Sequence, residues 1–243
     1  MFKNFTIAVL AAGLLIGTHA EAAGLCDGVT KEFLNAKVPF TVEEILDKKE
    51  ISDLKFCQVL IRVQSQKGSA YVTADKEAVL VGDLFRNKKR VSEQAFSTID
   101  EGSFRKHEKE VNQAVAFSYK PAGAHKHIYM FTDPDCPYCE KVKAEVQQWA
   151  FEKKIEVRVI LFPLPMHPTA REKAVKGICA SMTYDNYVRA EYPGQSCKAG
   201  EDKITASITV AKKIGVDGTP IFVGPTGKRS VGFSKESVEK ILR

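Results

Sequence analysis

The chain has 243 residues, and beyond its first two dozen it has no apolar run long enough to cross a bilayer. The apolar segment Phe5–Ile16 is itself too short, since about 12 residues fall below the roughly 20 that a spanning helix needs. Lys3 before this segment and the small residues at positions 20–22 after it are typical of a secretory signal peptide. We therefore predict a signal peptide over residues 1–22, cleaved after Ala22, and a soluble exported protein. A lipid anchor on Cys26 is disfavoured, because Leu25 stands where a lipoprotein signal has a small residue.

The sequence also lacks a strong excess of one charge. It contains 36 basic and 30 acidic residues, with 27% charged and 44% hydrophobic positions, which is ordinary for a globular protein. The basic run Arg86–Arg90 is isolated, and export argues against a nucleic-acid partner, so we interpret the run as a solvated loop. Removal of residues 1–22 takes away one Lys and one Glu and leaves the net charge of +6 unchanged.

Residues 23–90 have the pattern of a small α+β domain. Thr41 followed by Glu44 predicts a capped helix start. Alternating apolar residues then predict an antiparallel meander with strands over Phe56–Val63, Ser69–Thr73 and Ala78–Val81. Residues 91–120 are polar, helical in pattern and interrupted by Gly102, which predicts a solvent-exposed helical linker.

Residues 121–243 alternate strands with helices. Strands are expected over His127–Thr132, Ile155–Phe162, Thr219–Val223 and Ser230–Phe233. Helices are expected from Pro137, over about 169–183 and 201–214, and after Ser234 as a cap. The order βαβ, helical insertion, ββα predicts a thioredoxin fold with an added helical segment.

Cysteine is the residue with the clearest chemical meaning. An exported chain with an even number of cysteines is expected to form disulfides; the six are Cys26, Cys57, Cys136, Cys139, Cys179 and Cys197. Pro137 suits the first position of a helix, so Cys136 would lie at the helix N-terminus, where N–H groups favour a thiolate. We predict Cys136 as the nucleophile, with a lowered pKa, and Cys139 as the resolving thiol one turn further on.

Two neighbouring features bear on that prediction. The acidic side chains at positions 133, 135 and 140 oppose a thiolate, but the backbone donors are closer and fixed. A zinc site built from Cys136, Cys139 and the pair His125 and His127 is an alternative. It is disfavoured because the histidines would lie on a strand that leads away from the cysteines. We expect no metal and no other cofactor.

The stretch Gly218-Thr219-Pro220 precedes a predicted strand. An X–Pro bond can be cis at a cost of only about 0.5–1 kcal/mol, and such a loop can pair with an extended substrate chain beside the cysteines. The alternative is an ordinary turn proline. We predict that Thr219 and Pro220 form the substrate-binding loop.

The sequence resembles the periplasmic disulfide isomerase family of DsbC and DsbG, and is closer to DsbC. The resemblance rests on FTDPDCPYC at Phe131–Cys139, with the active-site dipeptide Pro137-Tyr138, on the later cysteines, on Gly218–Pro220, and on the upstream strand Gly68–Thr73. It implies a homodimer in which each protomer joins a cystatin-like dimerisation domain to a thioredoxin-like catalytic domain (121–243) through a linker helix. It further implies misfolded exported clients, a periplasmic location and a membrane reductase of the DsbD type.

The same resemblance assigns two of the remaining cysteines, whereas Cys26 and Cys57 depart from the family pattern. Cys179 and Cys197 match the structural disulfide of DsbC, which DsbG lacks. Pairing of Cys26 with Cys57 is then the simplest choice, although a free, intermolecular or regulatory pair stays open. Such a bond would close 31 positions and stabilise the domain by roughly 3–4 kcal/mol. Met130 stands where thioredoxins carry a buried carboxylate, which fits an easily reduced active-site disulfide.

Four functions are compatible with these residues. A disulfide isomerase or reductase with chaperone activity is favoured, because dimer formation would shield the cysteines from an oxidase partner. The alternatives are a dithiol oxidase, a DsbG-like reductase of sulfenic acids, and a periplasmic chaperone in which the thiols are secondary.

Overall fold

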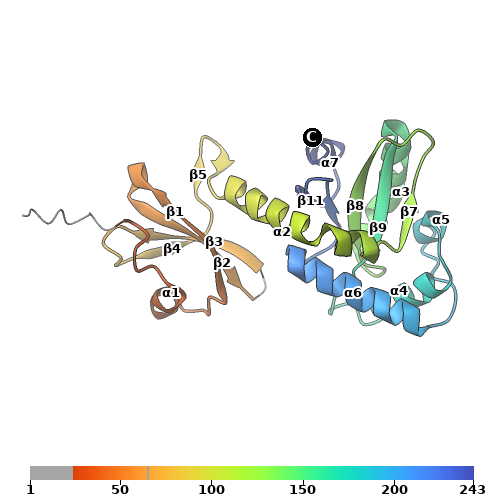
Figure 1. The fold of residues 1–243 in the computed structure, drawn as a ribbon, viewed down its shortest axis with the longest axis horizontal. Helices are drawn as coiled ribbons and strands as arrows, with labels where there is room; N and C mark the ends of the chain where they lie inside the picture. Colours follow the sequence, from red (N-terminus) through yellow and green to blue (C-terminus); the bar gives the residue numbers. More distant parts are fainter. Residues whose placement is uncertain (1–23, 65) are drawn as a thin grey trace, which may run out of the picture.

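The computed structural model describes residues 24–64 and 66–243, which form two lobes joined by one long helix (Figure 1). The predicted signal peptide at 1–22 lies outside the described residues. Across the described part of the chain, none of the helices has the length and apolarity that crossing a membrane requires.

The N-terminal lobe is a four-stranded antiparallel sheet in the order β1-β2-β3-β4. A short helix, α1 (Lys31–Lys37), supplies buried Leu34 to a core with β-branched residues of β2 and β3. The strands are β1 (Glu44–Ile51), β2 (Phe56–Val63), β3 (Gln66–Thr73) and β4 (Val79–Val81). A 3-10 turn, η1 (Ser52–Leu54), follows β1, and a two-stranded ribbon, β5 (Phe85–Arg86) and β6 (Lys89–Arg90), follows β4. The predicted meander is confirmed, and the cystatin-like description stays a prediction.

One element of this lobe differs from the prediction. The helix expected from Thr41 is absent, and Glu44–Ile51 is strand β1, paired with β2 from Glu44↔Arg62 to Ile51↔Phe56. The Asn35 side chain accepts a hydrogen bond from Val42 N at 2.7 Å and fixes the chain as it enters the strand. Pairing along the whole of β2 therefore outweighs the local capping pattern.

The connecting helix α2 (Glu93–Ala114) runs without a break through Gly102 and is not solvent-exposed on all sides. Phe104, Val111 and Ala114 are buried in a core cluster with residues of α6 (Lys198–Ile214). Their spacing places them along one stripe of the helix. The expectation of an exposed linker is therefore wrong for this stripe, which belongs to the C-terminal lobe.

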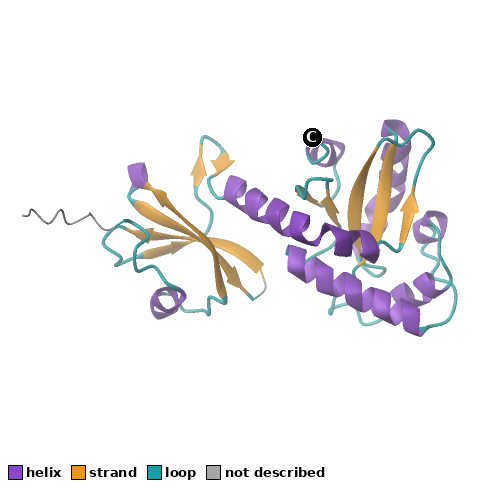
Figure 2. Ribbon diagram, in the orientation of Figure 1, coloured by secondary structure: helices purple, strands orange, loops and turns teal. Residues whose placement is uncertain are grey.

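The C-terminal lobe is built on a five-stranded mixed sheet in the order β11-β10-β8-β9-β7 (Figure 2). Its strands are β7 (Phe117–Tyr119), β8 (Lys126–Thr132), β9 (Ile155–Leu161), β10 (Ile221–Val223) and β11 (Arg229–Val231). β8 and β9 are parallel, whereas β10 is antiparallel to β8. β7 lies inside the segment predicted as a linker, but it pairs with β9.

The sheet separates two apolar layers because side chains alternate along each strand. On β8, Ile128 and Met130 enter the cluster formed with α3 (Pro137–Lys153). Tyr129 and Phe131 enter the opposite cluster, which is covered by α2 and α6. The predicted α+β and α/β fold, with a thioredoxin-like domain and a helical insertion, is confirmed.

The insertion comprises α4 (Ala170–Cys179), α5 (Tyr184–Val188) and the start of α6. A disulfide of 1.99 Å joins Cys179, at the end of α4, to Cys197, the cap of α6. Gly200 permits this contact, because a Cβ there would lie 2.6 Å from Cys179 Sγ. The chain ends in α7 (Lys235–Lys240), which Ser234 caps as predicted.

The two lobes also meet through an ion cluster around Asp100 of α2. Its carboxylate contacts Lys67 of the N-terminal sheet and lies 3.2 Å from Arg229 Nη1 of β11. Arg229 in turn donates to the carbonyl oxygen of Gly215 at 2.8 Å. Since all three charged side chains are largely buried, α2 is braced on both lobes.

Candidate active site

Cys136 and Cys139 lie where β8 ends and α3 begins, and both are free thiols. Cys136 is the N-cap of α3 with extended backbone (φ −75°, ψ 118°), and Pro137 is the first helical residue. The Cys136 amide donates to the Asp133 carbonyl oxygen at 3.2 Å, which closes the turn. Cys136 is 5% exposed and Cys139 1%, whereas Tyr138 between them is 69% exposed. Both thiols are therefore buried, but Cys136 keeps slightly more exposed area than Cys139 and adjoins the exposed Tyr138.

Thr219 and Pro220 lie directly against the outer cysteine. The Thr219–Pro220 bond is cis, and Cys136 Sγ donates a hydrogen bond to the Thr219 carbonyl oxygen at 3.5 Å. Sheet register explains the contact across 83 positions, because Ile221 of β10 pairs with Phe131 of β8. The turn before β10 and the turn after β8 consequently meet at one end of the sheet.

The inner thiol is strongly disfavoured as a thiolate. Burial raises the pKa of Cys139 to about 12, although the nearby Asp133 amide and the hydroxyls of Thr132 and Thr219 offset part of the effect. Cys139 therefore holds its proton at neutral pH. This asymmetry fits an outer nucleophile and an inner resolving group.

The acidic residues beside the cysteines are all paired. The buried Asp133 carboxylate accepts hydrogen bonds from the amides of Asp135 (2.7 Å) and Leu164 (2.6 Å) and lies 2.9 Å from His167 Nδ1. Burial opposes the charge of Asp135, but hydrogen bonds from Lys173 and Thr169 hold its pKa below the usual value. Most of the charge opposing a Cys136 thiolate is therefore compensated locally.

The third acidic residue has a partner that sequence reasoning missed. Glu140 lies 2.6 Å from Lys143 Nζ, and the Lys143 side chain is almost fully buried. The Lys143 ammonium also lies 5.5 Å from the ring centroid of Tyr187. The burial of Lys143 could have been inferred from its spacing, since it lies four residues after Cys139 and therefore on the same face of α3.

Other residues singled out from the sequence lie away from the thiols. His125 precedes β8 and His127 lies at its start, opposite the end that carries the cysteines. Within 24–64 and 66–243 there is no cluster of three or more metal-binding side chains. Met130 is fully buried in the core beneath α3. In the N-terminal lobe, Cys26 and Cys57 form a disulfide of 2.07 Å.

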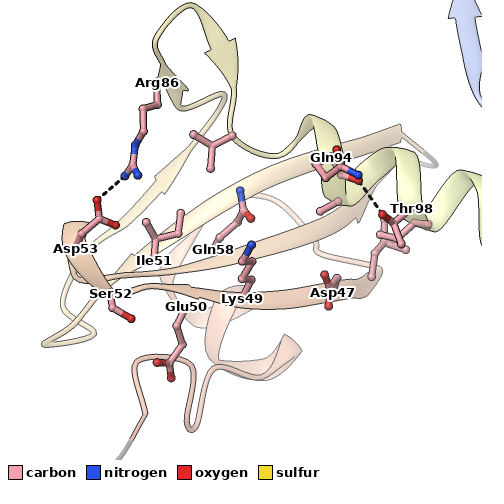
Figure 3. Close-up of a pocket in the computed structure, with 14 residues that line it drawn as sticks. Asp47, Lys49, Glu50, Ile51, Ser52, Asp53, Gln58, Arg86, Gln94 and Thr98 are labelled. Atoms are coloured by element: carbon pink, nitrogen blue, oxygen red, sulfur yellow. Dashed lines mark hydrogen bonds and ion pairs between the residues drawn. The ribbon is translucent and has the colours of Figure 1, made fainter.

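A groove of about 940 Å³ lies in the N-terminal lobe, far along the chain from the thiols (Figure 3). Its walls are β1, Gln58 of β2 and the first turns of α2. Apolar Ile51 and Ile99 share the lining with charged groups, and an ion pair of 2.9 Å joins Arg86 to Asp53 at one end. The groove is therefore a concave surface separate from the cysteine site.

Comparison with known proteins agrees with this geometry. A family model described as a thioredoxin-like domain matches residues 113–243. A curated relative, the thiol:disulfide interchange protein DsbG of Pseudomonas aeruginosa, is 28% identical over 100 residues, which are 40% of this chain and 39% of the relative. The chain thus matches well under half of that relative's length.

Two solved structures match parts of the chain at low identity. A disulfide interchange protein from Neisseria gonorrhoeae is 23% identical, with a TM-score of 0.44, and the match covers 55% of this chain and 98% of that one. Helicobacter pylori DsbG is 16% identical, with a TM-score of 0.38 and coverage of 74% and 93%. Because the family model spans more than half of the sequence, the chain belongs to the thioredoxin-like domain family, within which it resembles the DsbC and DsbG proteins.

Proposed function

We propose that the protein is an exported thiol:disulfide interchange enzyme that acts as an isomerase or reductase on misfolded or wrongly bridged proteins. One observation carries the proposal: Cys136 Sγ lies at the start of α3, 3.5 Å from the carbonyl of Thr219 in the cis-proline loop. A thiol at a helix start, beside backbone groups that can bind an extended chain, suits disulfide exchange with a protein.

The reaction follows from the two different thiol environments. The Cys136 thiolate attacks one sulfur of a client disulfide, and the other client sulfur leaves as a thiolate. Either a client thiol then attacks the mixed disulfide and restores Cys136, which completes an isomerisation, or Cys139 attacks it. The second route releases a reduced client and leaves a Cys136–Cys139 disulfide. A membrane thiol reductase of the DsbD type would restore that disulfide to two thiols.

Client binding is supported by exposed apolar side chains around the thiols. Tyr138, which separates the two cysteines in the sequence, and Met166 are both largely exposed. Met166 belongs to the loop that Asp133 holds through Leu164 N and His167. The two side chains therefore flank a surface on which an unfolded segment can lie while its disulfide reacts.

A homodimer is part of the proposal. β4 is an edge strand of the N-terminal sheet, and its Leu80 and Val81 are 55% and 51% exposed. An exposed apolar edge strand is suited to pairing with another chain. In the proposed dimer, β4 of a second copy would pair with this edge, and the thiol sites of the two copies would face a common space. The groove of Figure 3 supports the proposed chaperone activity, since it adds partly apolar concave surface.

The periplasm is the proposed location, by way of the predicted signal peptide. Within this compartment, a dithiol oxidase or a sulfenic-acid reductase would use the same thiols, and a chaperone would not need them. Refolding of scrambled ribonuclease measures isomerase activity, and oxidation of a reduced dithiol peptide measures oxidase activity. Cys136→Ala should abolish both and leave only chaperone activity.

Trapping is the decisive test. Cys139→Ala, expressed with its signal sequence, should accumulate mixed disulfides between Cys136 and exported proteins. The double variant Cys136→Ala/Cys139→Ala is the matched control and should trap none. If Cys139→Ala forms no adducts beyond those of the double variant, the proposed function is wrong.

A further inference from the structure

The resolving step depends on the protonation state of Cys139. Cys139 must become a thiolate while it is enclosed by the protein, although burial raises its pKa to about 12. Met130, on the neighbouring strand, provides no carboxylate that could take up the proton. The polar groups near the Cys139 sulfur that lower its pKa are the Asp133 amide and the hydroxyls of Thr132 and Thr219. The Thr219 hydroxyl has no hydrogen-bond partner among the described residues.

One of these hydroxyls is held by a second residue deep in the lobe. Thr132 Oγ1 and Tyr187 Oη are 2.6 Å apart, and both side chains are fully buried. Each hydroxyl has a single hydrogen, so only one of the two donates in this bond. When Tyr187 donates to Thr132, the Thr132 hydrogen is free to point at Cys139 Sγ. Burial raises the pKa of Tyr187 well above its usual value, so the donor keeps its proton.

We propose that Thr132 and Tyr187 are positioning residues for the resolving step. Tyr187 orients the Thr132 hydroxyl so that it donates to the Cys139 sulfur as negative charge develops there. Cys139 Sγ then bonds to Cys136 Sγ, the bond from Cys136 to the client sulfur breaks, and the client thiolate takes up the proton that Cys139 has lost. This inference rests on the proposed function and adds to it the means by which a buried thiol is activated.

The surroundings of Tyr187 allow its hydroxyl to be tested apart from its ring. The ring packs 5.8 Å from Phe117 and 5.5 Å from Tyr184, measured between centroids. The Lys143 ammonium lies over its face. Phenylalanine at position 187 keeps these contacts and removes only the hydrogen bond to Thr132. Tyr184 is a matched control, because it is a buried tyrosine of the same cluster whose hydroxyl donates instead to the Lys143 carbonyl at 3.1 Å.

Ellman's reagent separates the two steps in one experiment. The reduced protein releases one coloured thiolate when Cys136 attacks the reagent and a second when Cys139 displaces the remaining half. Loss of one hydrogen bond to a thiolate should raise the pKa of Cys139 by about one unit, which lowers the thiolate fraction about tenfold. A more basic thiolate is a better nucleophile, so the second phase should be about threefold slower overall. The first phase should not change.

The variants give distinct outcomes. Tyr187→Phe and Thr132→Val should slow the second phase and shift its pH dependence upward, whereas Thr132→Ser and Tyr184→Phe should not. Thermal unfolding of each variant shows that the lobe is folded. An unchanged second phase in Tyr187→Phe or Thr132→Val overturns the inference, as does equal slowing in Tyr184→Phe. Failure of Cys139→Ala to trap clients would instead refute the proposed function, so the two failures are distinguishable.

Discussion

Replacing Asp133 by alanine should destabilise the C-terminal lobe by about 3 kcal/mol. The carboxylate is fully buried and accepts hydrogen bonds from the amides of Asp135 at 2.7 Å and Leu164 at 2.6 Å. Each hydrogen bond to a charged group contributes about 1.5–3 kcal/mol. The partly exposed partner His167 adds about 1 kcal/mol or less. The buried carboxylate itself carries a desolvation cost, and removing it offsets part of the lost hydrogen-bond energy. The expected loss of stability therefore lies near the lower end of the summed range.

Urea unfolding followed by tryptophan fluorescence measures this loss in the correct lobe. Trp149 is the single tryptophan of the chain and is fully buried under the C-terminal sheet. The reduced protein should be used, so that the state of the two thiols does not contribute. Asp133→Asn keeps one acceptor oxygen and should lose roughly half as much as alanine.

The neighbouring residue provides the control. The Asp135 side chain accepts hydrogen bonds only from the side chains of Lys173 and Thr169, near the surface. Asp135→Asn should therefore cost about 1 kcal/mol or less. If Asp133→Ala lies within about 0.5 kcal/mol of the wild type, the carboxylate does not hold the loop as the contacts indicate.

Four further outcomes are expected. Brief treatment of the reduced protein with iodoacetamide at neutral pH should modify Cys136 and spare Cys139, as read by mass spectrometry, because the pKa of Cys139 is about 12; equal labelling of both would contradict this. Because this folded-state pKa lies above the ordinary 9.0, the stabilisation from protonated Cys139 should be complete below pH 9.0 and decline as pH rises towards 12 in urea unfolding. The paired change of Cys26 and Cys57 to serine should destabilise the N-terminal lobe by about 4 kcal/mol, since the bond closes 31 positions; circular dichroism during urea unfolding would show a separate early transition, and a single unshifted transition would count against it. Leu80→Lys places a charge on the exposed edge of β4 and should convert the proposed homodimer into a monomer in sedimentation velocity, with the wild type as the dimeric control; a variant that stays dimeric would exclude this edge as the interface.

The sequence was informative where local chemistry and tertiary structure agree. Pro137 indicated the start of α3, and alternating apolar residues indicated β2 at Phe56–Val63 with the bounds that the structure has. The loop at Thr219 could be placed beside the cysteines only through the strand order of the thioredoxin fold. That order was inferred from the alternation of strands and helices.

The sequence was misleading where long-range pairing decides. The capping pattern at Thr41 and Glu44 predicted a helix, yet the residues that follow pair along β2. On α2, Phe104 and Val111 stand among many polar residues, so the buried stripe is visible only once α6 lies against it. The contact of Thr132 with Tyr187 spans 55 positions and depends on how the insertion folds back, which no local pattern contains.

The continuity of α2 has a mechanical consequence for the whole molecule. At a rise of about 1.5 Å per residue its 22 residues span about 33 Å, and each residue turns the axis by about 100°. Its final turns are fixed in the C-terminal core, so the length and rotational phase of the helix set the distance and direction from the thiols to the β4 edge, the proposed dimer interface. Inserting or deleting one residue in it would rotate the reactive sulfur about the helix axis and change the space between the two copies of the proposed dimer.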